Sequence, residues 1–468
     1  MVKLADIGFR VLRLDEPLLK FQYGTSIYQE DVFKKKPYAG TKASIGVYIV
    51  KPMQNISEVK KCAFEVFVKN YYRGEGTEFP FSAWNGTKYT LSKRLSSDFN
   101  FVLENINGAE TFPETTIDEM GNKVENQSVD LLVFICDSKT IGSVHDRYKV
   151  IAHSNKKRVQ FLSSEILTAK VNSALSQERK DFIQGLSIQI LAKCGGIPWK
   201  LDKDDQRYKL KPGSIVIGLG YKKPESGVTV RGAAHFFDQE NSEEKFVAKS
   251  FSLSERDMRS LFFPTEVLKE IIKEAAAWYN VQSERQVTEL YILKKSRINP
   301  RELDALMSTG LNWIHIFVKK GGTLLRLYDI ANDISGKEFM IERGLALLSV
   351  PYSESVGGKN LNRIDATITT TGLYMKQYND GNDYAKGTLG TPRPLELEIH
   401  SNYICDAENI AKLVLALTKV DWESIDLEYR EPTVIKYAER MAELSYSASN
   451  LSPPVFLDNV NYDVRDLM

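Results

Sequence analysis

The stretch SIVIGLGYK, Ser214 to Lys222, decides the fold of this chain. It is a short apolar run that carries two glycines and ends at a tyrosine and lysines. Apolar runs of this length, bounded by turn-forming residues, are typical of strands that are buried on both faces. We therefore expect the central strand of a sheet here, and Gly220 leaves its end without a side chain.

The composition is that of an ordinary globular protein. A chain of 468 residues predicts two to three domains, and 43% hydrophobic with 26% charged residues allows large cores. The formal net charge is +1, so any basic surface must be local. We see no signal peptide and no apolar run near the about 18 residues that span a membrane. These features predict a cytoplasmic protein without membrane insertion, and the four scattered cysteines predict no disulfide framework.

Strands and helices alternate over the first half of the chain. The expected elements are strands at 43–50, 130–137 and 158–164 and helices at 57–74, 145–153 and 176–193. Ser57 is the expected N-cap of the first helix. This alternation predicts an α/β domain over residues 44–205, with a parallel sheet between helices. Residues 1–43 are expected to form an ordered leader that packs on the domains.

Residues 206–468 predict a second α/β domain with a mixed sheet. Strands are expected at 214–220, within 227–251, and at 287–295, 311–320, 323–329, 345–351 and 394–400; helices are expected at 264–280, 299–307, 408–419 and 432–446. PLELEIH, residues 394–400, alternates apolar and charged residues, which predicts a strand with one solvated face.

A terminal phosphate is bound by convergent cations and amide donors. His145 and Lys149 are four residues apart, so they share one face of a helix. Gln160 follows after a basic loop, and Lys193 stands at the end of the long helix. These four residues are candidates for a phosphate site, although their spacing alone also fits solvated helix surfaces.

Several motifs that occur in order resemble those of Argonaute proteins. The MID-like motifs are LDEPLLKF (14–21), KKKPYAG (34–40), HDRYK with RVQFLSS (145–164) and QILAKCGGIPWKL (189–201); the PIWI-like motifs are IVIGLG (215–220), LYILKKSRI (290–298), GTPRPLELEIH (390–400), LTKVDWES (417–424) and PTVIKYAERMAEL (432–444). The resemblance implies a Rossmann-like MID domain followed by an RNase H-like PIWI domain.

The resemblance implies a role for each candidate phosphate residue. The MID domain would bind the 5′-phosphate of a guide strand through His145, Lys149, Gln160 and Lys193, where His145 replaces the more common tyrosine. In some prokaryotic relatives the C-terminus turns back into this pocket. The Met468 carboxylate is therefore expected to help Gln160 hold a divalent ion, Mg²⁺ or Mn²⁺, beside the phosphate.

The resemblance also predicts that the PIWI domain does not cut nucleic acid. Cleavage by two metal ions needs several carboxylates that hold the ions about 4 Å apart. The aligned positions carry Gly220, Lys295 and Glu396, and the loop glutamate cannot be chosen among the acidic residues at 240–244. One carboxylate cannot hold two ions, so we expect no catalytic metal and an ion-pair or structural role for Glu396.

Basic residues flank the predicted PIWI strand ends, which line the nucleic-acid channel in this fold. Lys222, Lys223, Lys294 and Arg393 are the expected channel residues. Lysines that contact phosphates add affinity that depends on salt and not on sequence. Doubled lysines are equally compatible with the solvated edge of a sheet.

The resemblance begins near Leu14, which would leave no room for the N and PAZ domains of long Argonautes. The chain therefore resembles short prokaryotic Argonautes. Their function would be to hold a guide RNA or DNA, recognise a complementary invader strand, more often DNA, and signal through an accessory protein to an effector. Residues 1–43 are the expected contact with the accessory protein.

Three other functions remain as alternatives. An active RNase H-type nuclease is disfavoured by Gly220 and Lys295. A metabolic enzyme would need a glycine-rich phosphate loop, which does not follow residues 43–50. A scaffold that needs no guide is disfavoured by the four candidate phosphate residues, and copurifying nucleic acid would separate it from a guide-binding protein.

Overall fold

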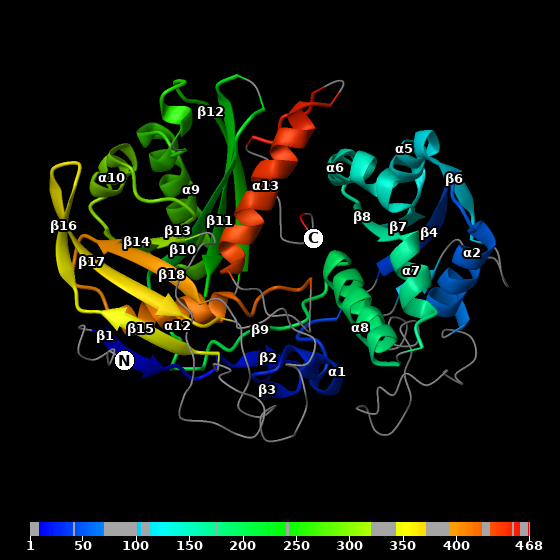
Figure 1. The fold of residues 1–468 in the computed structure, drawn as a ribbon, viewed down its shortest axis with the longest axis horizontal. Coiled ribbons are helices and arrows are strands. Elements are labelled where there is room, and N and C mark those ends of the chain that lie inside the picture. Colours follow the sequence, from blue (N-terminus) through cyan, green and yellow to red (C-terminus); the bar gives the residue numbers. More distant parts are fainter. Residues whose placement is uncertain are drawn as a thin grey trace, which may run out of the picture.

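The computed structural model places the chain in two neighbouring α/β bodies (Figure 1). It describes residues 9–40, 43–69, 101–103, 112–174, 176–225, 227–239, 243–259, 261–319, 343–370, 394–423, 431–451, 454–458 and 467. Within these ranges, no helix is long and apolar enough to cross a membrane. The first body is built on a five-stranded sheet and the second on a ten-stranded sheet.

The first body confirms the parallel sheet that the alternating pattern predicted. Its strands are β4 (Ala43–Lys51), β5 (Phe101–Leu103), β6 (Glu114–Thr116), β7 (Leu131–Cys136) and β8 (Arg158–Ser163), and its helices are α2 (Ile56–Phe64), α5 (Ile117–Asn126), α6 (Ser138–Ser154), α7 (Ser164–Val171) and α8 (Ser176–Lys193). The strand order is β5-β4-β7-β8, and β6 also pairs with β4. Alternate residues of β4 and β7 enter two apolar clusters, one under α5 and α6 and the other under α2, α7 and α8.

One local prediction in this body is wrong. Ser57 was expected to cap α2, but the helix begins at Ile56 and its N-cap is Asn55. Asn55 adopts a left-handed backbone conformation, φ 53°, that asparagine tolerates better than most residues. Ser57 therefore lies in the first turn of the helix.

The second body confirms that Ser214–Lys222 (β10) is an interior strand. The other strands are β1 (Phe9–Arg13), β11 (Thr229–Asp238), β12 (Glu243–Ser252), β13 (Glu289–Lys294), β14 (Asn312–Val318), β15 (Leu345–Ser349), β16 (Tyr352–Val356), β17 (Lys359–Ile368) and β18 (Leu395–Ser401). Their order is β1-β15-β17-β18-β14-β13-β10-β11-β12, and β16 pairs with β17. β10 is antiparallel to β11 and parallel to β13, which gives the predicted mixed sheet.

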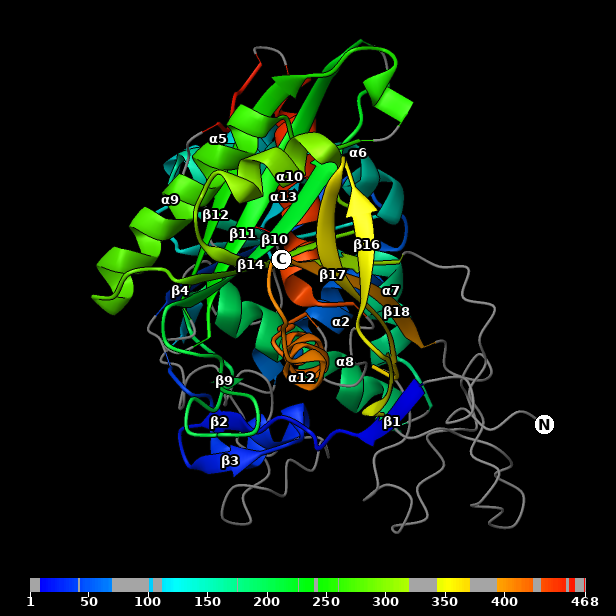
Figure 2. The same ribbon diagram turned by 90° about the vertical axis from the view of Figure 1, so that its left-hand side faces the viewer.

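Helices cover both faces of this sheet. They are α9 (Thr265–Ser283), α10 (Pro300–Met307), α12 (Ala407–Leu417) and α13 (Thr433–Ser449), with short turns η2 (Gln29–Asp31), η3 (Glu65–Lys69) and η4 (Asp257–Arg259) elsewhere in the chain. Ile215, Ile217 and Leu219 of β10 pack into the apolar cluster under α9 and α10. α13 lies on the opposite face, between the sheet and the first body (Figures 1 and 2).

Two glycines of β10 bring α13 onto the sheet. A Cβ atom added at Gly218 would lie 2.2 Å from the carbonyl oxygen of Val434, and one added at Gly220 would lie 2.3 Å from the backbone nitrogen of Glu439. Neither distance is compatible with a side chain. The close packing of α13 on β10 therefore requires a residue without a side chain at position 220.

The predicted leader is integrated into the fold. β1 pairs with β15 at one edge of the large sheet, whereas β2 (Leu19–Phe21) pairs with β3 (Gly24–Ser26) and β9 (Lys200–Leu201). The short helix α1 (Val32–Lys35) follows, with Val32 and Phe33 buried. The leader thus contributes β1 to the large sheet, and β2 and β3 to a small sheet of three strands.

Two further expectations for the second body fail. The β16–β17 hairpin was not predicted as strands, and the solvated face expected for residues 394–400 is wrong because Glu398 and His400 are each 1% exposed. Their polar groups are satisfied from the hairpin, where Arg363 binds Glu398 and Glu354 binds His400. The segment predicted as a strand at 323–329 lies outside the described residues.

Candidate nucleic-acid interface

Three of the predicted phosphate-binding side chains lie near one another, two on α6 and one at the end of α8. His145 and Lys149 lie one turn apart on α6, and Lys193 is the last residue of α8. Burial lowers the pKa of His145, and the charges of Lys149 and Lys193 lower it further. The three cationic groups are therefore within electrostatic reach of one another.

Lys193 is the most deeply buried of the three. Its side chain is 3% exposed, and its Nζ donates a hydrogen bond to the carbonyl oxygen of Val159 at 2.8 Å. Burial holds the pKa of Lys193 well below its ordinary value, and the charges of Lys149 and Arg440 lower it further. These surroundings disfavour the charged ammonium form of Lys193, and an anionic ligand would favour that form again.

Gln160 lies on β8, and its two neighbours in the sequence, Val159 and Phe161, contact Lys193 and His145 of this cluster. Val159 accepts the bond from Lys193, and the Phe161 ring contacts the His145 ring at a centroid distance of 5.4 Å. Gln160 Nε2 donates to the carbonyl oxygen of Phe161, whereas Oε1 is buried and has no hydrogen-bond partner within the described ranges. That oxygen is available to a ligand.

The end of the sequence reaches the same place. Lys149 Nζ donates to the carbonyl oxygen of Leu467 at 3.0 Å, and the Leu467 side chain is 3% exposed. Met468, the predicted carboxylate donor, lies outside the described residues. Its neighbour in sequence is nevertheless bound to one of the candidate phosphate residues.

The second body closes this site with α13, a contribution that the sequence analysis missed. Ser447 donates a hydrogen bond of 2.6 Å to Asp146, and the other oxygen of Asp146 lies 2.8 Å from Nδ1 of His145. Arg440 forms an ion pair with Glu423 and adds its charge to the surroundings of Lys193. We call His145, Lys149, Lys193 and Arg440 the cationic pocket.

Gly220 and Lys295, two of the positions predicted to be degenerate nuclease positions, lie close together beside α13. Lys295 Nζ is 2.5 Å from Glu431 Oε2 and 2.6 Å from Glu439 Oε2, and the backbone of Glu439 packs against Gly220. Burial disfavours the charged form of Lys295, but the two carboxylates outweigh it and raise its pKa above the ordinary value. An ammonium group thus neutralises the carboxylates at this strand end.

Glu396 is not part of that group. Its neighbours Leu395 and Leu397 enter the same apolar cluster as Val434 of α13, so alternation directs Glu396 to the other face of β18. There it forms an ion pair of 3.2 Å with Lys319. The expectation of an ion-pair role for Glu396 is confirmed, but the structure separates it from Gly220 and Lys295.

The predicted channel residues differ in their surroundings. The prediction for Lys294 is wrong because its side chain is 1% exposed and is bound to Glu302 of α10. Lys222 is partly exposed and lies 3.3 Å from Glu443, and Lys223 is exposed at the end of β10. Arg393 lies outside the described residues.

The loop glutamate has no good candidate within the described ranges. Glu244 Oε2 lies 2.8 Å from Nε2 of the buried His235, and Glu243 lies 3.5 Å from Lys200. Both face partners other than Gly220, and residue 240 is outside the described part of the chain.

Comparisons with known proteins support the fold. No family model matches the sequence, and no curated protein does. Among solved structures, Clostridium butyricum Argonaute bound to a guide DNA and a 19-mer target DNA matches with a TM-score of 0.62 at 16% identity, over 95% of this chain and 54% of that one. Marinitoga piezophila Argonaute in complex with 5′ OH guide RNA matches with a TM-score of 0.55 at 14% identity, over 92% and 58%. Its complex with guide RNA and target DNA gives the same score and identity, over 92% and 57%.

The chain therefore has an α/β fold of the Argonaute type, in which a Rossmann-like MID arrangement is followed by an RNase H-like PIWI arrangement. The resemblance seen in the sequence motifs is confirmed at the level of the fold. The chain spans a little over half the length of the structures that it matches.

Proposed function

We propose that this protein holds a 5′-phosphorylated guide strand and uses it to recognise a complementary nucleic acid. In this proposal residues 44–205 form the MID domain, residues 206–468 form the PIWI domain, and residues 1–43 join them. The observation that carries the proposal is the buried Lys193 beside Lys149 and Arg440. A terminal phosphate, with nearly two negative charges, would offset the mutual repulsion of these cations.

A divalent ion fits the same site. Mg²⁺ and Mn²⁺ prefer oxygen ligands, and the buried Gln160 Oε1 is an oxygen without a partner among the described residues. Gln160 and the carboxylate of Met468 would hold the ion, which would screen that carboxylate from the phosphate. The hydrogen bond from Lys149 to Leu467 supports this arrangement.

We further propose that the PIWI domain binds without cutting. A carboxylate at position 220 would collide with α13, and Lys295 neutralises Glu431 and Glu439 where metal ions would otherwise be needed. Recognition would then rest on base pairing and on contacts to the backbone of the duplex. An active RNase H-type nuclease is the alternative, and these two contacts disfavour it.

Signalling to other proteins is the last part of the proposal. We infer that target recognition passes through an accessory protein to an effector in defence against viruses or plasmids. The edge strand β1 supports a protein contact in the leader, because sheet edges accept strands from partners and Val11 is 49% exposed there. If the wild-type chain captures a partner protein and the Val11→Asp variant does not, the result would support a protein contact at β1.

Competitive binding of end-labelled strands tests the phosphate site. Wild-type protein should prefer a 5′-phosphate to a 5′-hydroxyl on the same DNA or RNA, and Lys193→Met should reduce that preference about tenfold or more, because charge-assisted hydrogen bonds contribute about 1.5–3 kcal/mol. Lys294→Met is the matched control, since it removes a buried lysine elsewhere. Equal loss of affinity for both strands in Lys193→Met would reject the site.

A further inference from the structure

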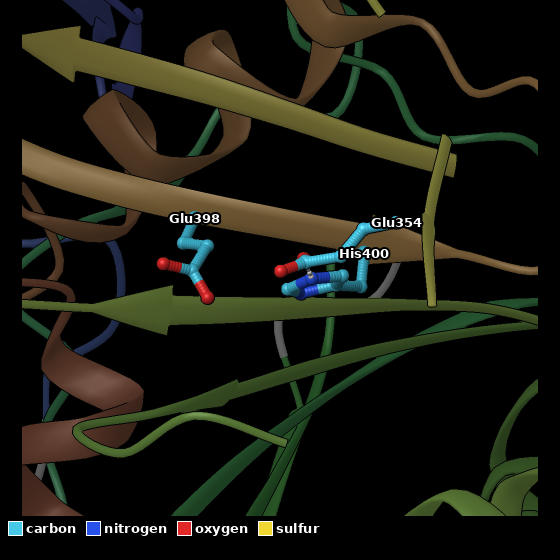
Figure 3. A group of neighbouring side chains, drawn as sticks. All are labelled: Glu354, Glu398 and His400. Atoms are coloured by element: carbon cyan, nitrogen blue, oxygen red, sulfur yellow. Dashed lines mark hydrogen bonds and ion pairs between the residues drawn. The ribbon is translucent and has the colours of Figure 1, made fainter. Parts of the chain in front are cut away.

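A second cluster of ionisable side chains lies on the face of the large sheet that points away from α13. Glu354 comes from β16, and Glu398 and His400 come from β18. One potential ligand atom of each lies within 4.8 Å of the other two. Figure 3 shows the Glu354 carboxylate over the His400 ring, with the Glu398 carboxylate farther along the same strand. His400 Nε2 and Glu354 Oε2 are 2.6 Å apart.

A second histidine beside this cluster is unsatisfied. His315 of β14 is the direct cross-strand partner of His400, their ring centroids are 6.3 Å apart, and each residue is 1% exposed. Within the described ranges, neither ring nitrogen of His315 has a hydrogen-bond partner, and Nδ1 of His400 has none. Leaving one buried polar group unpaired costs about 1–3 kcal/mol, and a bound ion or an ordered water is a usual explanation.

Arg363 holds the two carboxylates in position. Its Nη1 lies 2.8 and 2.9 Å from the two oxygens of Glu354, and its Nη2 lies 3.0 Å from Oε2 of Glu398. Arg297 also binds Oε2 of Glu398, at 2.9 Å. Carboxylates that bind metal ions are often held in this way by outer hydrogen bonds. With Asp365 included, three carboxylates face two guanidinium groups, so the cluster carries one excess negative charge.

We propose that Glu354, Glu398 and His400 bind one divalent transition-metal ion of the Zn²⁺ class, beside the unsatisfied ring of His315. Mixed imidazole and carboxylate ligands suit such ions better than Mg²⁺ or Ca²⁺. The ion would take the place of the proton between His400 and Glu354. Since its ligands come from β16 and β18, which both pair with β17, it would fasten β16 to the sheet.

Metal analysis of the guide-free protein tests the site. After treatment with a chelator and addition of Zn²⁺ followed by desalting, wild-type protein should retain about one equivalent, and His400→Ala should retain less than about one-tenth. His235→Ala is the matched control. His235 is also 2% exposed, pairs with Glu244 at 2.8 Å and has an unpartnered Nδ1, but it has no second histidine and no second carboxylate in its contacts within the described residues.

Co²⁺ provides a readout that does not depend on any variant. One equivalent should give wild-type protein the visible absorption of a tetrahedral or five-coordinate site, and Zn²⁺ should displace it. A wild-type protein that retains no Zn²⁺ and shows no Co²⁺ absorption would overturn the proposal, and an ordered water would then account for His315. Equal Zn²⁺ retention by the His400→Ala and His235→Ala proteins would also overturn the proposed metal site. Gln160→Ala should leave the Zn²⁺ content of the guide-free protein unchanged, which separates this site from the ion proposed beside a guide phosphate.

Discussion

Glu439 and Arg440 are consecutive residues of α13, yet they belong to two different sites. Glu439 Oε2 lies 2.6 Å from Lys295 at the end of β13, whereas Arg440 pairs with Glu423 and is part of the cationic pocket. One helix therefore connects the predicted degenerate nuclease positions to the proposed guide site. A displacement of α13 on guide binding would move both.

The packing of α13 predicts the effect of restoring a carboxylate. Gly220→Asp should destabilise the protein by about 1–3 kcal/mol or more, because overpacking a tight contact forces the backbone apart. It should not produce cleavage. Urea unfolding measures the stability change, and Gly142→Ala is the control, since a Cβ there meets nothing within 4 Å in the interior of α6. That control should be neutral or stabilising by about 0.5–1 kcal/mol. A fully stable Gly220→Asp protein would contradict the contact.

Guide binding should be linked to proton uptake. Burial and the charges of Lys149 and Arg440 hold the pKa of Lys193 well below its ordinary value, and a bound phosphate would raise it. Affinity for a 5′-phosphorylated strand should therefore fall as pH rises from the lowered pKa of the free protein to the raised pKa of the complex. Calorimetry in two buffers with different ionisation enthalpies gives the number of protons taken up.

The variants separate Lys193 from other groups that titrate during binding. Lys193→Met should take up fewer protons, whereas Lys294→Met, which removes a buried lysine outside the pocket, should match wild type. Burial also lowers the pKa of His145, so some uptake should persist without Lys193. Identical uptake in all three proteins would show that the buried lysine does not meet the phosphate.

A guide-loaded protein should leave a complementary strand intact in Mg²⁺ or Mn²⁺. Lys295→Ala should not restore cleavage, because Gly220 still provides no carboxylate for a metal ion. Gel analysis of an end-labelled target over several hours measures this. The proposal of an inactive PIWI domain is wrong if the wild-type protein gives a cut product and the Glu439→Gln or Glu396→Ala variant does not.

Lys419 should make stability depend on pH. It is buried in an ion-pair cluster with Glu16 and Arg343, and burial, with the Arg343 charge, lowers its pKa to about 7. Between about pH 7 and the unfolded pKa near 10.4, the unfolded chain binds more protons, so unfolding free energy should rise with pH by up to about 1.4 kcal/mol per unit. Lys419→Met should flatten this part of the curve, whereas the exposed substitution Lys269→Met should not. If the unfolding free energy of all three proteins changes with pH in the same way, the lowered pKa assigned to Lys419 is contradicted.

Much of the fold could be predicted because its strands and helices have strong local patterns. Ser214–Lys222 and the strand that contains Leu290 are apolar runs, and α8 and α9 have helical length and clear end signals. The β16–β17 hairpin was missed, because β16 and the first half of β17 are mostly polar. It is held by pairing between its strands, by the pairing of β17 with β15 and β18, and by the contacts of Arg363.

The site was harder to predict than the fold. Spacing placed His145 and Lys149 on one helix face, and the structure agrees. In the pair Lys294 and Lys295, alternation along β13 turns one lysine to α10 and the other to α13. The sequence does not reveal which helix covers which face. Arg440 was missed for the same reason, although two glycines at alternate positions of β10 signal a helix packed closely on that face.

The pairing of β1 with β15 has a consequence for biosynthesis. Residues 9–13 are synthesised long before their pairing partners, residues 345–349. At about 5–20 residues per second, the first strand waits tens of seconds for its place in the sheet. During that time, the segment is an unpaired strand with an exposed edge, open to chaperones, to a partner made from the same message, or to aggregation. The large sheet can reach its full width only after β18 has been synthesised.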